Sequence, residues 1–449
     1  MLPGCETEVH MKIQLPGQVP PFTFIIPTPP ASYPLPANTQ ASAQPNPKSH
    51  AREPFTMAEV QNNPATTTET TATTTGAPAD ESQIIQEAPL LSKVRYGATA
   101  FAIQNFVVKP ALFLRDVKAR IIPSEHRPDF VKTYECRPYL PVRMFFPKCF
   151  DKTSKDKLPV LFTIHGGGFV LGTPDDNDDW NAAYATQHHS MVIGLNYAKA
   201  PGNPFPGPIH DCEELFLASL NDESLPIDKT RVALAGWSAG GNLCLAVSQL
   251  ASVKKHLSAI VPLYPCTDLS LEAEEKAKSR RYKPDLGGFR AKEKDFLLSI
   301  APVFDWSYKV PGESARNPLL SPAYAPKDAF PKQVFMIGCE LDLLAHEGQR
   351  LIHSLAGRPA PPAVVGKEET VEKGELILDD ERFHFEDSNP DGSRYRWLLV
   401  PDTVHGFDQH LDGIVRDPVL LEDAEIKTQK TIKMIGEWVL KAPPTTASS

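Results

Sequence analysis

Residues 231–252 read RVALAGWSAGGNLCLAVSQLAS, and this stretch decides the fold. An apolar run at 231–235 is followed by residues 236–240, GWSAG, and then by apolar residues at helical spacing. A sharp turn from strand to helix strains the backbone at the central serine, and only small residues two positions before and after it leave room for the turn. The GxSxG pattern therefore predicts a nucleophile at Ser238, although a glycine-rich turn with an idle serine has the same pattern.

A second motif, further upstream, favours the nucleophile. After a predicted strand at 160–164, residues 165–169 read HGGGF. Consecutive glycines at the carboxyl end of a strand leave backbone N–H groups free to converge on an incoming oxygen. We expect Gly167, Gly168 and Ala239 to donate these N–H groups to an oxyanion. A phosphate-binding loop fits poorly, because no GK[ST] or GxGxxG follows.

A serine hydroxyl needs a base near neutral pH, and 13 histidines compete for that role. His405 is the predicted base, because it follows the last predicted strand, at 397–400, and comes after the serine in the chain. His188, His189 and His346 lie within or beside predicted helices, where a surface or packing role is expected.

The base needs a carboxylate that holds its ring in the right orientation. Asp342 is the predicted acid, because it follows a predicted strand at 333–337 through a short loop. Its rivals are Glu340, Glu347 and Asp402, and a single loop carboxylate can equally be a solvated surface charge. The resulting chain order, serine then acid then histidine, is the one expected where a GxSxG turn lies in a parallel sheet.

From about residue 159, short apolar runs alternate with longer helical stretches, which is typical of a parallel sheet with crossover helices. Because the runs are mostly apolar, we predict an α/β fold with a mostly parallel central sheet and helices on both faces. The predicted strands are 160–164, 191–196, 231–235, 258–263, 333–337 and 397–400, and the predicted helices are 211–218, 241–252 and 426–440.

The first 90 residues have a different composition. They collect much of the proline and include a threonine-rich tract at 67–75. Such a composition cannot bury enough apolar surface to offset the entropy of the chain. We therefore predict a disordered extension over 1–90 and an α/β domain over 91–445, with a polar insertion at about 357–396 that forms a surface hairpin or loop outside the catalytic core.

Composition excludes several classes of protein. The 55 acidic and 46 basic residues give a net charge of −9, which argues against a nucleic-acid partner. The 7 cysteines are widely spread and lack CxxC or histidine-paired spacing, so neither a disulfide framework nor a metal site is predicted, and no cofactor.

No secretion signal precedes the domain, and no run reaches the roughly 18 apolar residues of a membrane-spanning helix, so a cytoplasmic location and no transmembrane segment are predicted. The best membrane candidate, 98–114, is interrupted by Gln104, Lys109 and Pro110, which favours an amphipathic lid or core helix.

These motifs resemble those of the hormone-sensitive-lipase-like branch of the α/β-hydrolase fold. Residues 197–201, YAKAP, with Phe205-Pro206 and Asp211, resemble that family's YRLAPE…FP…D segment, and the resemblance extends over 159–440. The other matching segments are 240–243, GGNL; 264–269, YPCTDL; 320–322, LSP; and 342–344, DLL, with 347–348, EG. The resemblance implies serine carboxylesterase or lipase chemistry, and a mobile cap built from about 92–135 and 268–318.

The sequence departs from the family pattern at two positions. Trp237 stands where the family has an acidic residue before the nucleophile, and Gly202 stands where YRLAPE has its glutamate. A polar network that supports the serine is therefore either missing or rebuilt, which affects the expected range of substrates more than the triad.

The prediction is a serine hydrolase that cleaves a small-molecule carboxylic ester through an acyl-enzyme. Three alternatives keep the same residues: acyl transfer, lactone opening and amide cleavage on a specialised metabolite. A catalytically silent ligand receptor on the same fold is a further alternative, but such relatives lose the serine or the histidine, whereas this chain retains both. The oligomeric state is not predicted.

Overall fold

The computed structural model describes residues 84–121, 124–363, 366–368, 374–376, 378, 381–409 and 417–445. The predicted disordered extension lies outside the described residues, apart from its last few positions. Ile84 forms a β-bridge with Ser314, and a helix begins at Leu90. The ordered structure therefore starts before residue 91, where the predicted domain begins.

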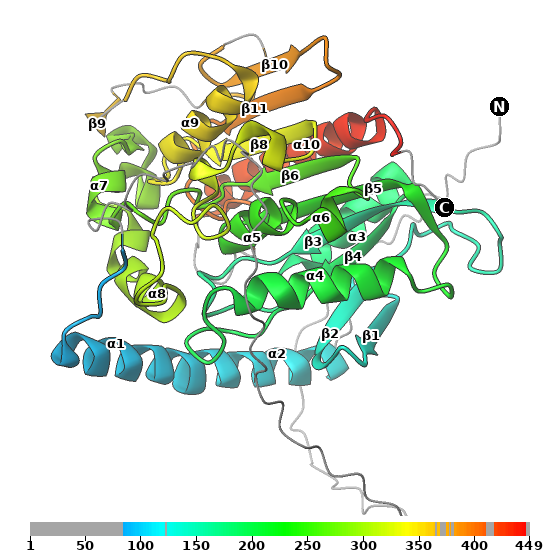
Figure 1. Cartoon of the computed structure of the whole chain (residues 1–449), viewed down its shortest axis with the longest axis horizontal. Helices are drawn as coiled ribbons and strands as arrows, with labels where there is room; N and C mark the ends of the chain where they lie inside the picture. The colour runs from blue at the N-terminus through cyan, green and yellow to red at the C-terminus, as the bar shows by residue number, and fades with distance from the viewer. Residues whose placement is uncertain are drawn as a thin grey trace, which may run out of the picture. The chain divides into compact units, whose positions relative to one another are not determined.

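The centre of the fold is a nine-stranded sheet with the order β1-β2-β4-β3-β5-β6-β8-β11-β10 (Figure 1). The six strands from β4 to β11 in this order are parallel, and β1, β2 and β10 pair antiparallel at the two edges. The strands are β1 (Phe130–Tyr134), β2 (Arg137–Phe145), β3 (Leu158–Ile164), β4 (Met191–Leu195), β5 (Ile227–Trp237), β6 (Ala259–Leu263), β8 (Gln333–Cys339), β10 (His384–Ser388) and β11 (Arg394–Val400). The six predicted strands are thus confirmed as the parallel part of the sheet.

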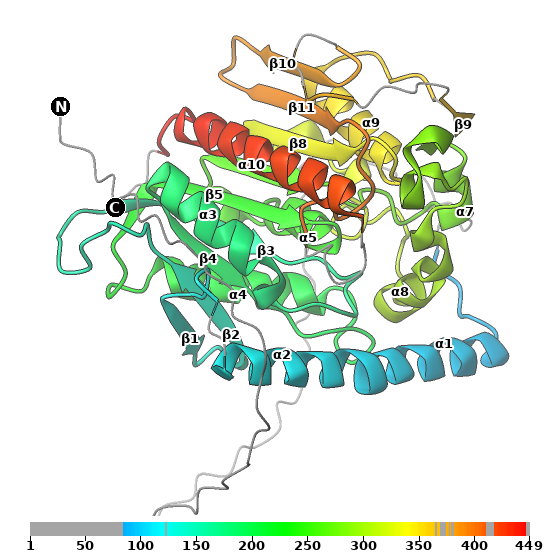
Figure 2. The same ribbon diagram turned by 180° about the vertical axis from the view of Figure 1, so that it is seen from behind.

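Helices cover both faces of the sheet, as predicted. The helices α4 (Gly207–Leu220), α5 (Ala239–Val247), α6 (Ala251–Lys254) and α9 (Ala345–Ala356) lie on the face seen in Figure 1. The helices α3 (Asp178–His188) and α10 (Pro418–Leu440) cover the opposite face, seen in Figure 2. Alternate residues of each strand therefore enter two separate cores: Phe162 of β3 packs with the first group of helices and its neighbour Leu161 packs with the second.

The helix predicted over 211–218 is longer in the structure, as α4, and the other two predicted helices differ more in their boundaries. The helix predicted over 241–252 ends as α5 at Val247, and the chain turns before α6 begins. The helix predicted from 426 begins eight residues earlier, at Pro418 in α10. Asp417 caps this end, because its carboxylate accepts a hydrogen bond from the backbone N–H of Val419.

The segments expected to form a cap are mainly helical. The first contains α1 (Leu90–Ala102), the π-helical turn η2 (Ile103–Val108) and α2 (Lys109–Ile121), which form one continuous rod across the domain (Figure 1). The second contains α7 (Ala273–Ala277), β7 (Arg281–Tyr282), the short 3₁₀ turns η4 (Pro284–Leu286), η5 (Gly288–Ala291) and η6 (Phe296–Ser299), and α8 (Ala301–Tyr308), which packs on α1.

The polar interval predicted to lie outside the core belongs partly to the sheet. Its end forms β10, the edge strand, and the start of β11, while β9 (Gly366–Lys367) pairs with β7 of the second cap segment. This part of the interval is an antiparallel pair at the edge of the sheet, and β10, with the sequence HFEDS, has the polar composition of an edge strand that is only partly buried.

Candidate active site

The turn at Ser238 has the strained geometry expected of a nucleophile. Ser238 follows β5 directly and precedes α5, with φ 55° and ψ −116°. Positive φ is rare outside glycine, so the surrounding structure must hold this conformation. A Cβ added at Gly236 would lie 2.1 Å from the carbonyl oxygen of Gly240, and one at Gly240 would lie 2.1 Å from the carbonyl oxygen of Ile164. Both positions therefore require glycine.

The structure brings the three predicted triad residues together. His405 Nε2 lies 2.8 Å from Ser238 Oγ, and His405 Nδ1 lies 2.7 Å from Asp342 Oδ2. Asp342 follows β8 and His405 follows β11, so the carboxyl ends of three parallel strands supply the three groups. The Asp342 carboxylate is fully buried, and the His405 side chain is 9% exposed.

Charges around His405 favour its protonated form. Burial alone would lower the pKa of the imidazole, but the adjacent carboxylate of Asp342, with Asp295 and Asp408 nearby, raises the pKa of His405 above its ordinary value. Burial, together with the charge of Asp342, also raises the pKa of Asp295. Asp295 belongs to the second cap segment and pairs with Arg280 at 3.0 Å. The cap therefore places an ion pair beside the triad.

The rivals for the triad positions have other partners. Glu340 and Asp402 both pair with Lys283, at 2.8 and 2.7 Å, and Glu347 pairs with Lys276 at 2.8 Å. The rival histidines lie in or beside helices: His188 ends α3, His189 follows it, and His346 lies in α9.

The glycine loop after β3 lies beside the serine. A Cβ added at Gly166 would lie 3.1 Å from the carbonyl oxygen of Trp237 and 3.4 Å from Cβ of Ser238, so the loop packs tightly against the serine turn. Gly167 and Gly168 have φ of 111° and 59°, values that glycine adopts without strain. Ala239 begins α5, so its N–H lies in the first helical turn, where it has no carbonyl partner within the helix. These three are the predicted oxyanion donors.

The comparisons with known proteins agree with this geometry. Residues 161–369 match a family model described as the alpha/beta hydrolase fold. The chain is 30% identical over 227 residues to an arylesterase of Saccharolobus solfataricus, an alignment that covers 49% of this chain and 68% of the relative. The chain belongs to the esterase-type α/β-hydrolases. The resemblance to the hormone-sensitive-lipase-like branch is thereby confirmed.

Other relatives match this α/β-hydrolase over shorter stretches. It is 37% identical over 113 residues to the carboxylesterase NlhH of Mycobacterium tuberculosis, an alignment covering 25% of this chain and 34% of that protein. Among solved structures, an esterase of Pyrobaculum calidifontis superposes with a TM-score of 0.53 at 20% identity, covering 78% of this chain and 98% of the esterase. That superposition supports the fold.

The oxyanion loop of this hydrolase has a polar support that the sequence did not predict. His165 Nδ1 lies 2.7 Å from the carbonyl oxygen of Gly166, and its ring stacks on Tyr197 at 4.4 Å between centroids. Burial, helped by the neighbouring Lys199, holds the pKa of His165 well below its usual range, so the ring is neutral. Nδ1 therefore donates to Gly166, and Nε2 accepts from Lys199 Nζ at 3.2 Å. Burial in turn lowers the pKa of Lys199 to about 7.

A polar network connects the serine turn with the segment that carries the base. Trp237 is buried, and its indole N–H donates to Asp408 Oδ2 at 2.9 Å. Asp408 also accepts a hydrogen bond from the hydroxyl of Tyr264, whose ring packs edge-on against His405. Burial raises the pKa of Asp408, although the hydrogen bonds from Tyr264 and Trp237 oppose this. The Asp408 carboxylate thus connects Trp237, which precedes the nucleophile, to Tyr264, whose ring lies beside the base.

The remaining family motifs have structural roles. Asn242 Nδ2 donates to the carbonyl oxygens of Cys266 and Leu320 at 2.8 and 3.0 Å, which joins α5 to two loops. Glu347 accepts from the backbone N–H of Thr267 at 2.8 Å. Asp211 accepts from the N–H of Ala198 at 3.0 Å and so fixes the segment that follows β4. These residues position the loops around the triad.

The cap aromatics differ in role. Tyr308 is buried and stacks on Phe169, and Trp306 packs against Tyr96 of α1, so both are packing residues. Phe304 lies over the oxyanion loop: a Cβ added at Gly168 would come within 2.2 Å of its ring. Of the three aromatics, Phe304 is therefore the one that faces the site.

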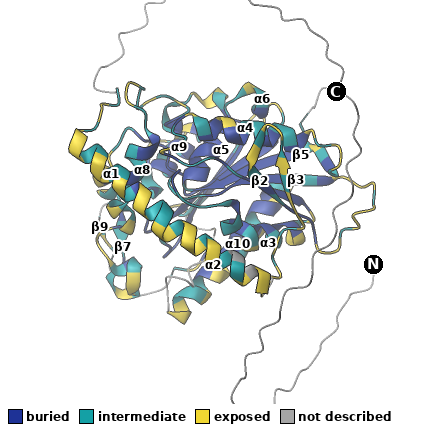
Figure 3. Cartoon of the chain, turned by 90° about the horizontal axis from the view of Figure 1, so that it is seen from below, coloured by how far each residue is buried: buried dark blue, intermediate teal, exposed yellow. Residues whose placement is uncertain are grey.

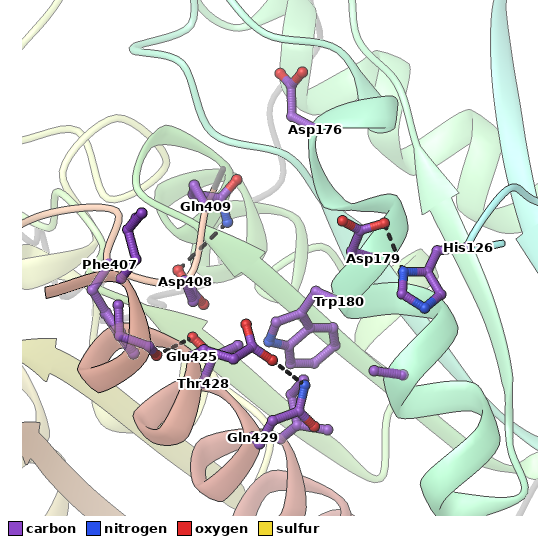
Figure 4. A pocket seen from close by; sticks show the side chains of 14 residues that line it. His126, Asp176, Asp179, Trp180, Phe407, Asp408, Gln409, Glu425, Thr428 and Gln429 are labelled. Carbon is purple, nitrogen blue, oxygen red and sulfur yellow. Dashed lines mark hydrogen bonds and ion pairs between the residues drawn. The ribbon is translucent and has the colours of Figure 1, made fainter. Parts of the chain in front are cut away.

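Two cavities adjoin the triad region. An apolar cavity of about 100 Å³ is lined by His405 together with Phe289, Phe296, Phe407 and Leu420. A second cavity, of about 450 Å³, lies between α3 and α10 and contains no triad residue (Figure 4). Four carboxylates contribute to its lining, namely Asp176, Asp179, Asp408 and Glu425. The first cavity is thus apolar and adjoins the base, whereas the lining of the second is rich in carboxylates.

Proposed function

We propose that this hydrolase cleaves carboxylic esters of small molecules through a covalent acyl-enzyme at Ser238. The observation that carries the proposal is the unbroken chain of hydrogen bonds from Ser238 Oγ through His405 to Asp342. A histidine that is hydrogen-bonded to both a serine and a buried carboxylate is the arrangement that activates a serine hydroxyl. The strained turn at the serine and the adjacent glycine loop support the same chemistry.

In the first step, Ser238 Oγ attacks the acyl carbon while His405 Nε2 takes the hydroxyl proton. The tetrahedral oxyanion receives hydrogen bonds from the N–H groups of Gly167, Gly168 and Ala239, and each such donor lowers the barrier by about 3 kcal/mol. Asp342 accepts from Nδ1–H, which keeps Nε2 free as the base and stabilises the imidazolium. His405 then gives the proton to the leaving alkoxide, the C–O bond breaks, and the alcohol departs.

In the second step, His405 removes a proton from water, and the hydroxide attacks the acyl-enzyme. The second oxyanion collapses, Ser238 recovers its proton from His405, and the carboxylic acid leaves. No redox step and no further reactant is needed, because water supplies both the oxygen and the proton.

The proposal is tested with p-nitrophenyl esters from acetate to palmitate, using the wild-type protein and Ser238→Ala. We expect turnover by the wild type, no turnover above background by Ser238→Ala, and circular dichroism that matches between the two. Ser354→Ala is the matched control, because Ser354 lies in α9, away from the triad. Full activity in Ser238→Ala would refute the assignment.

A serine-directed fluorophosphonate separates the covalent mechanism from simple base catalysis. We expect one phosphonyl group on the wild-type chain, located on the peptide that contains Ser238, and none on Ser238→Ala. Labelling at another serine, or hydrolysis without labelling, would contradict an acyl-enzyme at Ser238.

A further inference from the structure

The long helical rod formed by α1, η2 and α2 presents an apolar face to solvent. Of the seventeen large hydrophobic side chains that are exposed among the described residues, nine lie on this rod. They are Leu90, Leu91, Val94, Phe101, Phe106, Val107, Phe113, Leu114 and Ile121, each 60% exposed or more. Figure 3 shows the rod crossing the surface with exposed residues along its length. Such a patch usually marks an interaction site.

The π-helical turn η2 keeps this face continuous. A π turn holds more residues than an α turn and so rotates the following helix relative to the preceding one. Phe101 and Phe106, five positions apart, make an edge-to-face contact at 6.2 Å between centroids across this turn. The exposed aromatic residues of α1 and η2 therefore share one outward surface.

Polar contacts fix the inward face of the rod to the domain. Gln104 donates to the carbonyl oxygens of Val170 and Ala200 at 3.0 and 2.9 Å. Arg115 donates to Asp176 at 2.7 Å and to Thr173 at 2.8 Å. These contacts hold the helix against the domain and direct its apolar face outward.

The charges on the rod are mostly positive. Residues 96–108 carry no charged side chain, and the only acidic residue between 90 and 121 is Asp116. Arg95 on one side of this uncharged stretch, and Lys109, Lys118 and Arg120 on the other, are exposed. In a chain with a net charge of −9, this makes the rod a locally cationic and apolar surface.

We propose that this face lies on an anionic phospholipid membrane, with the helix parallel to the surface. Aromatic and aliphatic side chains that enter the acyl boundary, with flanking lysine and arginine at the headgroups, are the chemistry that such a surface recognises. The rod is long and apolar enough over Leu90–Arg115 to cross a membrane, and only 6% of its most apolar window is buried. Crossing would, however, break the Gln104 and Arg115 contacts with the domain.

A second copy of the chain is a poorer occupant. A twofold-symmetric contact through the rod would bring its exposed cations, which lie on both sides of the uncharged stretch, near exposed cations of the other copy. Their repulsion would oppose the contact, whereas the negative headgroups of an anionic membrane attract them. The positive charge of the rod's exposed face therefore favours an anionic membrane over a second copy of the chain.

The test is flotation of the full-length protein with vesicles of phosphatidylcholine alone or mixed with phosphatidylserine. We expect binding to the mixed vesicles, weaker binding to the neutral ones, and weakening by salt, because exposed charges are screened. The triple variant Phe101→Ser, Phe106→Ser, Phe113→Ser should bind at least about tenfold more weakly. Its matched control replaces three exposed hydrophobics elsewhere, Tyr139→Ser, Val419→Ser and Ile426→Ser, and should bind as the wild type does.

A charge variant tests the electrostatic part. Lys118→Glu with Arg120→Glu should reduce binding to the mixed vesicles and leave the weak binding to neutral vesicles unchanged. Lys155→Glu with Lys157→Glu, on the exposed loop before β3, is the matched control and should bind normally. Thermal unfolding of each variant verifies that the fold is retained.

Three results would overturn the proposal. The first is wild-type protein that floats with neither kind of vesicle. The second is a dimer, seen by light scattering, that the phenylalanine variant splits while vesicle binding is unaffected. The third is equal binding to both lipids that survives alkaline extraction, which would indicate a spanning helix instead. None of these readouts depends on esterase turnover, so the outcome is independent of the proposed function.

Discussion

The indole Nε1 of Trp237 lies 2.9 Å from Oδ2 of Asp408, so the residue before the nucleophile is bonded to the segment that carries the base. Asp408 follows His405 by three positions, and its other oxygen accepts from Tyr264, the ring that packs against His405. Asp408 contacts no reacting atom and acts through these neighbours. It is therefore a positioning residue.

We predict that Asp408→Ala lowers kcat more than it raises KM, because the serine and histidine loops lose their shared anchor. It should also lower the free energy of unfolding by about 1–3 kcal/mol for each buried donor left without an acceptor. Asp156→Ala, at an exposed position, is the control and should change neither quantity. Steady-state kinetics and urea denaturation measure the two effects. An unchanged kcat in a destabilised Asp408→Ala protein would reduce Asp408 to a purely structural residue.

The pH dependence of kcat/KM follows from the raised pKa of His405. The imidazole must be neutral to accept the serine proton, so activity is lost as the pH falls through its pKa. Because Asp342 raises that pKa, the acid limb of the profile should lie above pH 6.5, the ordinary value for histidine. Measuring kcat/KM from pH 5 to 9 with a substrate that does not ionise locates this limb. A midpoint below 6.5 would contradict the raised pKa.

The Asp342→Asn variant separates the charge of the acid from its geometry. It removes the negative charge but keeps a group of the same size beside His405. We expect the rate to fall about 10⁴-fold and the acid limb of the residual activity to move to lower pH. If the acid limb of the variant's pH profile stayed at the wild-type pH, another carboxylate, Asp295 or Asp408, would set the pKa of His405.

The parallel part of the sheet and the triad residues could be predicted because their signals are local. A strand, a glycine-flanked serine and a helix follow one another within 231–252, and steric crowding at that turn permits few other residues. The chain order of Asp342 and His405 then restricts which strand ends can supply them. These signals come from residues that are close together in the chain or from their order along it, so they can be recognised without the structure.

The edges of the sheet and the support network could not be predicted, because their signals are weak or long-range. The strand β2, which lies between the edge strand β1 and β4, contains Pro138 and Pro141, which argue against a strand, and its first residues are largely exposed. Trp237 and Asp408 are 171 positions apart, so nothing local pairs them. An amphipathic helix was predicted over 98–114, but not the full rod from Leu90 to Ile121, because the π turn η2 interrupts the periodicity of an α-helix.

Phe304 and Gly168 form a steric pair that we expect to control the acyl group. Phe304→Ala removes the ring over the oxyanion loop and should move the chain-length optimum toward longer or bulkier esters. Gly168→Ala should abolish turnover, because its Cβ would meet that ring at 2.2 Å and because φ is 59°. The double variant should recover little activity, because an alanine at position 168 must still adopt a positive φ. The p-nitrophenyl series measures all three variants, and an unchanged optimum in Phe304→Ala would exclude this residue from the acyl site.

Lys283 neutralises two carboxylates behind the triad, and its loss should destabilise the fold. Its Nζ lies 2.8 Å from Glu340 and 2.7 Å from Asp402, and both carboxylates are fully buried. Lys283→Met would leave the buried Asp402 without its cation and Glu340 with Arg281 at 3.5 Å, and should cost about 3–5 kcal/mol of unfolding free energy. Lys278→Met is the matched control, because Lys278 is 68% exposed and its ion pair with Glu275 contributes little.

The pH dependence of the free energy of unfolding distinguishes stabilisation by the charge of Lys283 from stabilisation by ordinary packing. Burial lowers the pKa of Lys283, but Glu340 and Asp402 outweigh it and raise the pKa above its ordinary value. The stabilisation is therefore fully present below the unfolded pKa of about 10.4 and is lost as the pH rises through the higher folded value. Urea denaturation at pH 8 and pH 11 should show a gap between wild type and Lys283→Met that narrows at the higher pH. A gap that is constant with pH would mean that the lysine stabilises the fold by packing and not by charge.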